Sequence, residues 1–415
     1  MCSYVQRHTG VWLILVAIFS IPALAEECGT IKRYREAISC ALKRAPEARR
    51  SELELKLADA EVDRARQFQN PELESKNLWN SGNSIGSGEF STETQLLFNV
   101  SISGKRSAQK KLAYAQKESA IALAQSTREK VMLETAEHLH RLRQLETEVF
   151  LADEAIERFG RIISAFKRRP QLNPEQRVSL TVFKYALEEE KQKKSRAVAE
   201  QSSILSDLAL DFGQKVEKDK ALFPKLPNKW PDIATVATVD GSDLKLAKSR
   251  RLEAKAQHDF QRASAWPNLK IGPAYERSAE RDRTEERYGI GIAMELPIFN
   301  FNGAGRRSGE IASAIGELES NQAQNATRVK LDSLKEQYLA ITTALNSAPS
   351  QAELEKGHRE FESQFTRGLV SYGLIIEAHR QLHEIVETKH TQELTALNLY
   401  WRIHQLTGHL TPEVL

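Results

Sequence analysis

The sequence lacks the features of nucleic-acid-binding proteins and of helical membrane proteins. Its formal net charge is only +3, and bases alternate with acids along the chain, which is typical of solvated helix faces. After residue 25, no apolar run approaches the ~20 residues that a membrane-spanning helix needs. We therefore expect neither a nucleic-acid partner nor a transmembrane helix.

Cysteine is also scarce, and its positions bear on export. Residues 1–25 have the pattern of a secretory signal peptide: Arg7, an apolar stretch over 11–21 and a small-x-small cleavage site at 23–25. Only Cys28 and Cys40 follow. In an exported chain, a disulfide between them is favoured over free thiols or a metal pair. Lipid attachment at Cys28 is a weaker alternative, because Glu27 is a poor residue before a lipidated cysteine.

Proline is absent from Lys105 to Arg169, where Gly160 is the only glycine. This stretch predicts a single helix of roughly 100 Å, at ~1.5 Å per residue, which is too long to be buried in an ordinary domain. Its apolar residues alternate by four and three, as in the seam of a coiled coil. These residues are Leu145, Val149, Ala152, Ile156, Phe159, Ile163 and Phe166.

The chain is expected to reverse at two helical tips. Residues 169–175 contain Pro170 and Pro174, and a second helix is expected to return from Gln176 to about residue 212. Residues 367–373 form the second expected tip, and a last helix follows to about residue 406.

One plan occurs twice along the chain, which predicts a tandem duplication. In each half a Pro-x-Leu turn, a polar loop and an alternating segment precede a glycine that opens a long helix. We expect a first repeat over residues 26–225, with strands at about 72–80 and 92–103. We expect a second repeat over residues 226–415, with strands at about 268–277 and 287–298.

Apolar and polar residues alternate along these strands, most clearly from Tyr288 to Leu296. The alternation fits strands between lipid and water, and equally a sheet half buried on a soluble core. Four strands cannot close a membrane barrel, because such barrels begin at 8 and an open edge leaves backbone groups unpaired in lipid. Membrane insertion would therefore require several chains to share one barrel. By alternation, Lys270, Glu276 and Glu295 would face its lumen, either selecting ions or, as we favour, forming a solvated wall.

In this order and spacing, the motifs resemble the outer-membrane efflux proteins of the TolC superfamily, most closely the branch typified by the CzcC cation-efflux channels. The resemblance covers nearly the whole chain from Tyr34 onward. Its most specific segments are Asn70–Leu73, Gly104–Arg106, Glu295–Asn300 and Gly368–Ser371.

The resemblance implies a mainly α fold with a small β part. Long coiled-coil hairpins would form a periplasmic α-barrel, and each subunit of a homotrimer would give four transmembrane strands to a twelve-stranded β-barrel in the outer membrane. The tips would meet a periplasmic adaptor protein, which links the channel to an inner-membrane efflux pump. Carried over to this sequence, the docking tip would comprise Gly368, Leu369, Val370 and Ser371, with Gln171, Leu172 and Asn173 in the first repeat. There the sequence departs from the family, because Pro170 and Pro174 replace the usual glycine-centred turn.

Two motifs could carry chemistry. His379, His383 and His390 share one helix face, because their offsets are 4 and 7, and such imidazoles could hold a soft or borderline cation. Solvated or packed histidines are the alternative that we favour. Gly82–Gly86 matches the serine nucleophile elbow, but that motif needs a helix after it, and a loop between two strands is expected here.

These expectations indicate an outer-membrane channel subunit of a tripartite efflux system. It would conduct its substrate passively, and heavy-metal cations are the favoured substrate. We expect no enzyme and no cofactor, because the partner pump would drive transport. Drug and protein-secretion ducts share the architecture. A soluble periplasmic coiled-coil scaffold is the rival from another class, although a scaffold needs no lipid-competent strands. A metal-binding periplasmic protein would rest on the histidines alone.

Overall fold

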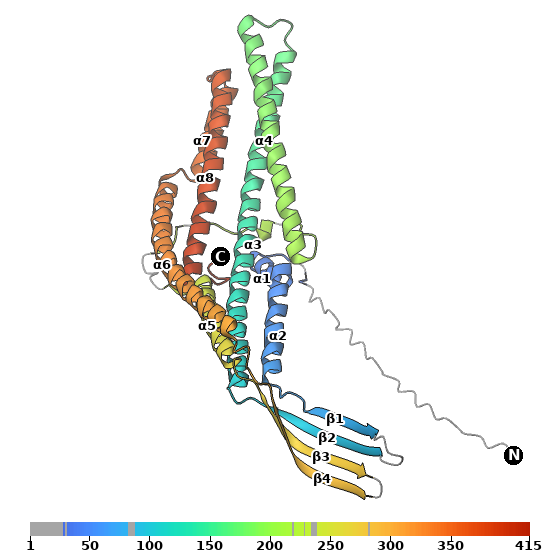
Figure 1. Cartoon of the computed structure of the whole chain (residues 1–415). Coiled ribbons are helices and arrows are strands. Elements are labelled where there is room, and N and C mark those ends of the chain that lie inside the picture. Colours follow the sequence, from blue (N-terminus) through green and yellow to red (C-terminus); the bar gives the residue numbers. More distant parts are fainter. Residues whose placement is uncertain are drawn as a thin grey trace, which may run out of the picture.

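The computed structural model describes residues 28–29, 31–81, 88–217, 220–227, 229–233, 239–280 and 283–415. The expected signal peptide over 1–25 and the Gly82–Gly86 motif lie outside these residues. A four-stranded sheet lies at one end of a long helical bundle, and the tips of two helical hairpins lie at the other (Figure 1). The expected fold class, mainly helical with a small β part, is confirmed.

Each half begins with helix, continues with two strands and returns to long helices, although the first half has one more helix before its strands. The first half comprises α1 (Tyr34–Arg44), α2 (Pro46–Arg66), β1 (Glu72–Ser81), β2 (Gly88–Val100), α3 (Lys105–Lys167), α4 (Pro174–Phe212) and the short 3₁₀ turn η1 (Lys220–Leu222). The second half comprises α5 (Ser242–Ala263), β3 (Leu269–Glu280), β4 (Arg283–Met294), α6 (Gly303–Ser347), α7 (Gln351–Thr366) and α8 (Tyr372–Thr407).

Helix α3 is the longest of the described helices, and the local sequence explains where it begins and where the chain turns after it. It has 63 residues, about 95 Å at ~1.5 Å per residue. Gly104 precedes it with a φ of 74°, a left-handed conformation that glycine adopts freely. Beyond its end, Asn173 caps α4 by accepting a hydrogen bond from the backbone N–H of Gln176 at 2.7 Å, and Pro174 occupies the first helical position.

The four strands form one antiparallel sheet in the order β1-β2-β3-β4. β2 begins at Gly88, earlier than expected, and β4 ends at Met294. Glu295 therefore lies one residue past the end of β4, and its position toward a lumen stays a prediction. Just beyond it, the N–H of Ile298 donates to the carbonyl of Leu296 at 2.8 Å, a tight turn next to Pro297, which has no N–H to continue a ladder.

Most of the core lies along α3, which packs against α2, α4, α5 and α8. In the middle of the bundle, α1 packs onto α3 and α4 through a cluster that includes Ala41, Leu139, Leu145 and Leu208. A second cluster, near the tips, joins α3, α4 and α8 around Phe159, Phe166, Phe183 and Ile375. The expected seam residues of α3 are all buried or half-buried.

Cys28 and Cys40 form a disulfide that ties the start of the described chain to α1. Cys40 is buried in the α1–α3–α4 cluster, whereas Cys28 lies at its margin. We expect Cys28→Ala to lower the free energy of unfolding by about 3 kcal/mol, because the crosslink no longer restricts a short loop in the unfolded chain. Denaturant titration with and without reductant checks this, because reductant should destabilise the wild type and leave the variant unchanged.

A buried histidine in α3 predicts how stability depends on pH. His140 packs against the rings of Tyr34 and Trp401, and its ring nitrogens have no hydrogen-bond partner within the described structure. Burial, with a smaller contribution from the charge of Arg143, lowers the pKa of His140 to about 3. The neutral ring therefore stabilises the fold fully above pH ~6.5, and this contribution is lost as the pH falls toward 3.

We expect the wild type to lose about 2–3 kcal/mol through His140 between pH 7 and pH 4.5. His140→Phe keeps an aromatic ring that cannot be protonated. Its free energy of unfolding should fall less over the same pH range, and denaturation at the two pH values measures the difference. Equal losses in the two proteins would contradict the assignment.

Candidate functional site

The sheet has one apolar and one polar face. Residues that lie directly across neighbouring strands share a face, and the register places Leu73 opposite Leu96, and Ile271 opposite both Phe98 and Ile292. The apolar side chains on this face also include Trp79, Phe90, Val100, Leu269, Tyr275, Tyr288, Ile290 and Met294. Tyr288 is 79% exposed and Ile290 is 73% exposed, so no part of the described chain covers this face over β4.

The opposite face carries charge. Lys270 donates to Glu72 at 2.5 Å, and Glu276 lies 3.8 Å from Arg287. Of the three residues expected to face a lumen, Lys270 and Glu276 lie on this polar face, and Glu295 lies past the end of β4. Gly272 is required here, because a side chain would collide with the carbonyl oxygen of Leu96 on β2.

Both edges of the sheet are open. Among the described residues, β1 pairs only with β2, and β4 pairs only with β3. Each edge strand has ten residues or more, so a long row of backbone N–H and C=O groups faces outward. An exposed apolar face together with two open edges describes a sheet that is incomplete in a single chain.

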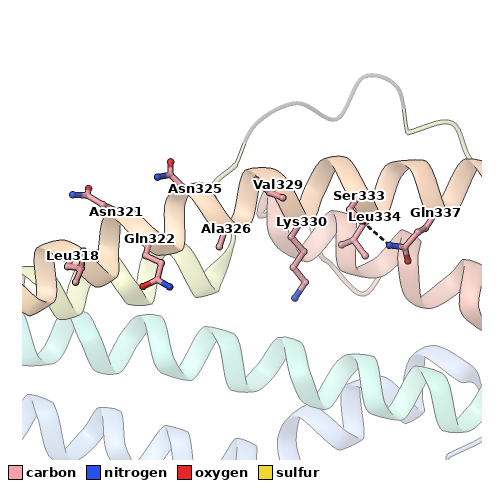
Figure 2. Close-up of a pocket in the computed structure, with 10 residues that line it drawn as sticks. All are labelled: Leu318, Asn321, Gln322, Asn325, Ala326, Val329, Lys330, Ser333, Leu334 and Gln337. Atoms are coloured by element: carbon pink, nitrogen blue, oxygen red, sulfur yellow. Dashed lines mark hydrogen bonds between the residues drawn. The ribbon is translucent and has the colours of Figure 1, made fainter.

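Helix α6 also carries an exposed surface. It packs against α5 and α8, and a groove of about 940 Å³ follows the stretch from Leu318 to Gln337 (Figure 2). Leu318 and Val329 are 67% and 71% exposed, and amide side chains such as Asn321 and Asn325 lie between them. This mixture of apolar and amide side chains suits contact with another helix.

The second tip, between α7 and α8, has an exposed apolar residue. Gly368 has a φ of 78°, and the hydroxyl of Ser371 caps α8 by accepting from the N–H of Leu374 at 3.4 Å. Leu369 is 71% exposed, whereas Val370 is half-buried. The four predicted tip residues all line a groove of about 960 Å³.

The first tip, between α3 and α4, is built differently. Gln171 and Asn173 are exposed, but Leu172 packs against the aromatic cluster near the tips. Its side chain therefore stabilises the turn and offers little apolar surface to a partner. The two predicted tips are not equivalent in what they expose.

The histidine face of α8 points into the bundle, where each histidine meets a different carboxylate. His383 Nε2 lies 3.4 Å from Glu190 of α4, and His390 Nδ1 lies 2.8 Å from Glu148 of α3. His379 instead approaches His358 and Glu362 of α7. The sequence correctly placed the three histidines on one face, but the structure does not bring them together as one set of ligands.

Burial is the largest single influence on the pKa values along this face. It lowers the pKa of His383, assisted by the nearby charge of Lys193, and it raises the pKa of Glu190. Burial alone would also raise the pKa of Glu148, but hydrogen bonds from His390 and Arg141 lower it further than burial raises it. Arg141 also pairs with Glu200 of α4 at 2.7 Å, so these ionic contacts join α3, α4 and α8.

The residues that sequence reasoning missed are the partners of the histidines. Glu148, Glu190 and Glu362 lie on other helices, so their proximity to α8 depends on how the helices pack. Only the spacing of His358 and Glu362, four residues apart on one helix, gave a local signal.

Within the described part of the chain, no helix combines the length and the hydrophobicity needed to span a bilayer.

No protein-family model matches the sequence, and no curated protein matches it. Solved structures do match. The open state of the MtrE outer membrane channel of Neisseria gonorrhoeae has a TM-score of 0.67 at 14% identity, covering 92% of this chain and 91% of that one. The CmeC outer membrane channel of Campylobacter jejuni has a TM-score of 0.69 at 10% identity, covering 91% and 86%. CusC, described in terms of transmembrane channel formation, has a TM-score of 0.60 at 17% identity, covering 88% and 91%.

At these identities the likeness concerns the fold. The chain has the fold of outer-membrane channels of the TolC type, over nearly their whole length, and the expected resemblance is confirmed at that level. CusC is among the matches without standing apart from them, so no branch of these channels is singled out.

Proposed function

We propose that this chain is the subunit of a trimeric outer-membrane channel that serves a tripartite efflux system. The observation that carries the proposal is the incomplete sheet, with its exposed apolar face and its two open edges. Three copies would join edge to edge into one closed twelve-stranded barrel, which removes every unpaired edge from lipid. The apolar face would then contact lipid, and Lys270 and Glu276 would line the lumen.

The helices support the same assembly. The exposed groove on α6 would be covered by a neighbouring subunit, which extends the barrel into a helical conduit (Figure 2). The tips lie far from the sheet (Figure 1), where a periplasmic adaptor and the pump behind it would meet them. We propose that the repeats divide near residues 225 and 226, and that residues 1–25 are removed on export.

For the cargo we propose heavy-metal cations, on the resemblance of the sequence motifs to the cation-efflux branch. Growth of a deletion strain in zinc, cobalt, cadmium and a panel of drugs tests this. Sensitivity to metals alone, restored by the cloned gene, supports the proposal. Sensitivity to drugs alone would assign the chain to a drug duct of the same architecture.

The channel itself is tested by membrane fractionation, followed by mild-detergent extraction and native mass of the solubilised protein. We expect an outer-membrane species with three times the mass of the processed chain. A soluble periplasmic monomer or dimer would mean that the sheet does not form a membrane barrel, and the scaffold alternative would replace the channel.

A further inference from the structure

Three side chains beneath the second tip have the geometry of a metal site. His358 and Glu362 lie on α7, and His379 lies on α8. The two Nε2 atoms are 3.3 Å apart, and Glu362 Oε1 lies 3.6 Å from that of His358 and 3.7 Å from that of His379. We propose that these three residues bind a divalent first-row transition metal, with zinc as the ion that fits best.

The size of the triangle supports zinc. The point equidistant from its three corners lies about 2 Å from each, which matches the ~2.0–2.2 Å bonds that zinc forms with imidazole nitrogen and carboxylate oxygen. Three protein ligands on one side leave a fourth position for water. Two imidazoles and a carboxylate also suit zinc better than magnesium or calcium, which prefer oxygen.

The tautomer of His379 favours coordination. Its Nδ1 lies 2.9 Å from the carbonyl of Ile375, and a carbonyl can only accept, so Nδ1 carries the proton. The lone pair of Nε2 then faces the other two groups. A hydrogen bond from the distal ring nitrogen to a backbone carbonyl is the usual support of a zinc-binding histidine.

Glu362 adds an independent observation, a buried carboxylate oxygen without a hydrogen-bond partner among the described residues. Its Oε2 pairs with Arg158 of α3, whereas its Oε1 is buried and has no hydrogen-bond partner within the described structure. That oxygen lies 3.7 Å from Nε2 of His379, which is an acceptor in this tautomer. Without a metal, Nε2–H of His358 donates to His379, and a metal ion would take the place of that proton. A groove of about 520 Å³ runs alongside the site and is lined in part by His358 and Glu154.

The position of the site indicates what the metal would do. Glu362 lies one turn before the end of α7, and His379 lies in the second turn of α8, so the ion would tie the two helices together just behind Gly368–Ser371. Because Glu362 also pairs with Arg158 of α3, the ion would link α3 to the same two helices. The site lies within the bundle of one chain, so its metal is structural and does not depend on the cargo of the channel.

The test uses the full processed protein in detergent, stripped with a chelator and titrated with Zn²⁺ by calorimetry. We expect one zinc per chain and a higher melting temperature with zinc. His358→Gln and Glu362→Gln should each weaken binding at least tenfold. With Co²⁺ as the probe, the wild type should show the visible absorption of a four-coordinate ion, and the two variants should lose it.

His383→Gln is the matched control, because it removes a buried histidine one turn from His379 and leaves the proposed ligands intact. It should bind zinc like the wild type. Circular dichroism and elution volume verify that each variant folds. A wild type that binds no zinc, or a His383→Gln protein as impaired as His358→Gln, would overturn the proposal. Neither result depends on transport, so the channel proposal is judged separately.

Discussion

Ile290→Arg is expected to remove most of the protein from the outer membrane. Ile290 is 73% exposed on the apolar face of β4, opposite Pro273 of β3, and the proposed barrel places it against lipid. An arginine on the lipid face costs about 2–4 kcal/mol near the middle of a bilayer and less toward its interfaces. A trimer carries the substitution three times, so we expect the outer-membrane trimer to fall at least tenfold.

Gly289→Arg is the control for this prediction. Gly289 is the neighbouring residue on the same strand, lies on the polar face, and has open space where a side chain would begin. The same charge at the same depth should therefore leave the trimer near its wild-type level. Quantifying the protein in outer-membrane fractions compares the two variants. If Gly289→Arg reduced the trimer more than Ile290→Arg, the lipid and lumen faces would have to be exchanged.

Local patterns in the sequence predicted the strands and the long helices that follow them, but not α1 and α2. The stretch without proline before Pro170 predicted α3, whose observed end at Lys167 is close to the expected one. Alternation predicted the four strands and placed Lys270 and Glu276 on the polar face. The ladder ends at Met294, shortly before Pro297, so a lumen position for Glu295, one residue further on, stays a prediction.

The contacts between helices could not be predicted in the same way. Periodicity showed that His379, His383 and His390 share a face, but the carboxylate that each one meets depends on the packing of α3, α4 and α7 around α8. The same limit applies to the tips. The family resemblance makes Leu172 and Leu369 equivalent tip residues, yet packing against the aromatic cluster near the tips half-buries only Leu172.

This difference between the tips leads to the second large effect, at Leu369. An exposed leucine at the end of a helical hairpin offers apolar surface to a partner, and the few hot-spot residues of an interface cost about 2 kcal/mol or more when truncated. We expect Leu369 to be one of them. Leu369→Asp places a carboxylate just before the first turn of α8, where the helix dipole favours negative charge, so the fold should tolerate it. We expect the trimer to remain at its wild-type level and adaptor binding to fall roughly thirtyfold.

Two further variants separate docking from stability. Leu369→Ile keeps an apolar side chain and should retain export, whereas Leu172→Asp should act by unfolding the first tip, because Leu172 packs on the aromatic cluster. Resistance to the exported substrate, adaptor capture and trimer level are measured in each strain. Loss of capture with a normal trimer in Leu369→Asp alone identifies the second tip as the docking surface. Normal capture in that variant would move the contact to residues away from Gly368–Ser371, with the polar turn at Gln171 as the remaining exposed part of the first tip.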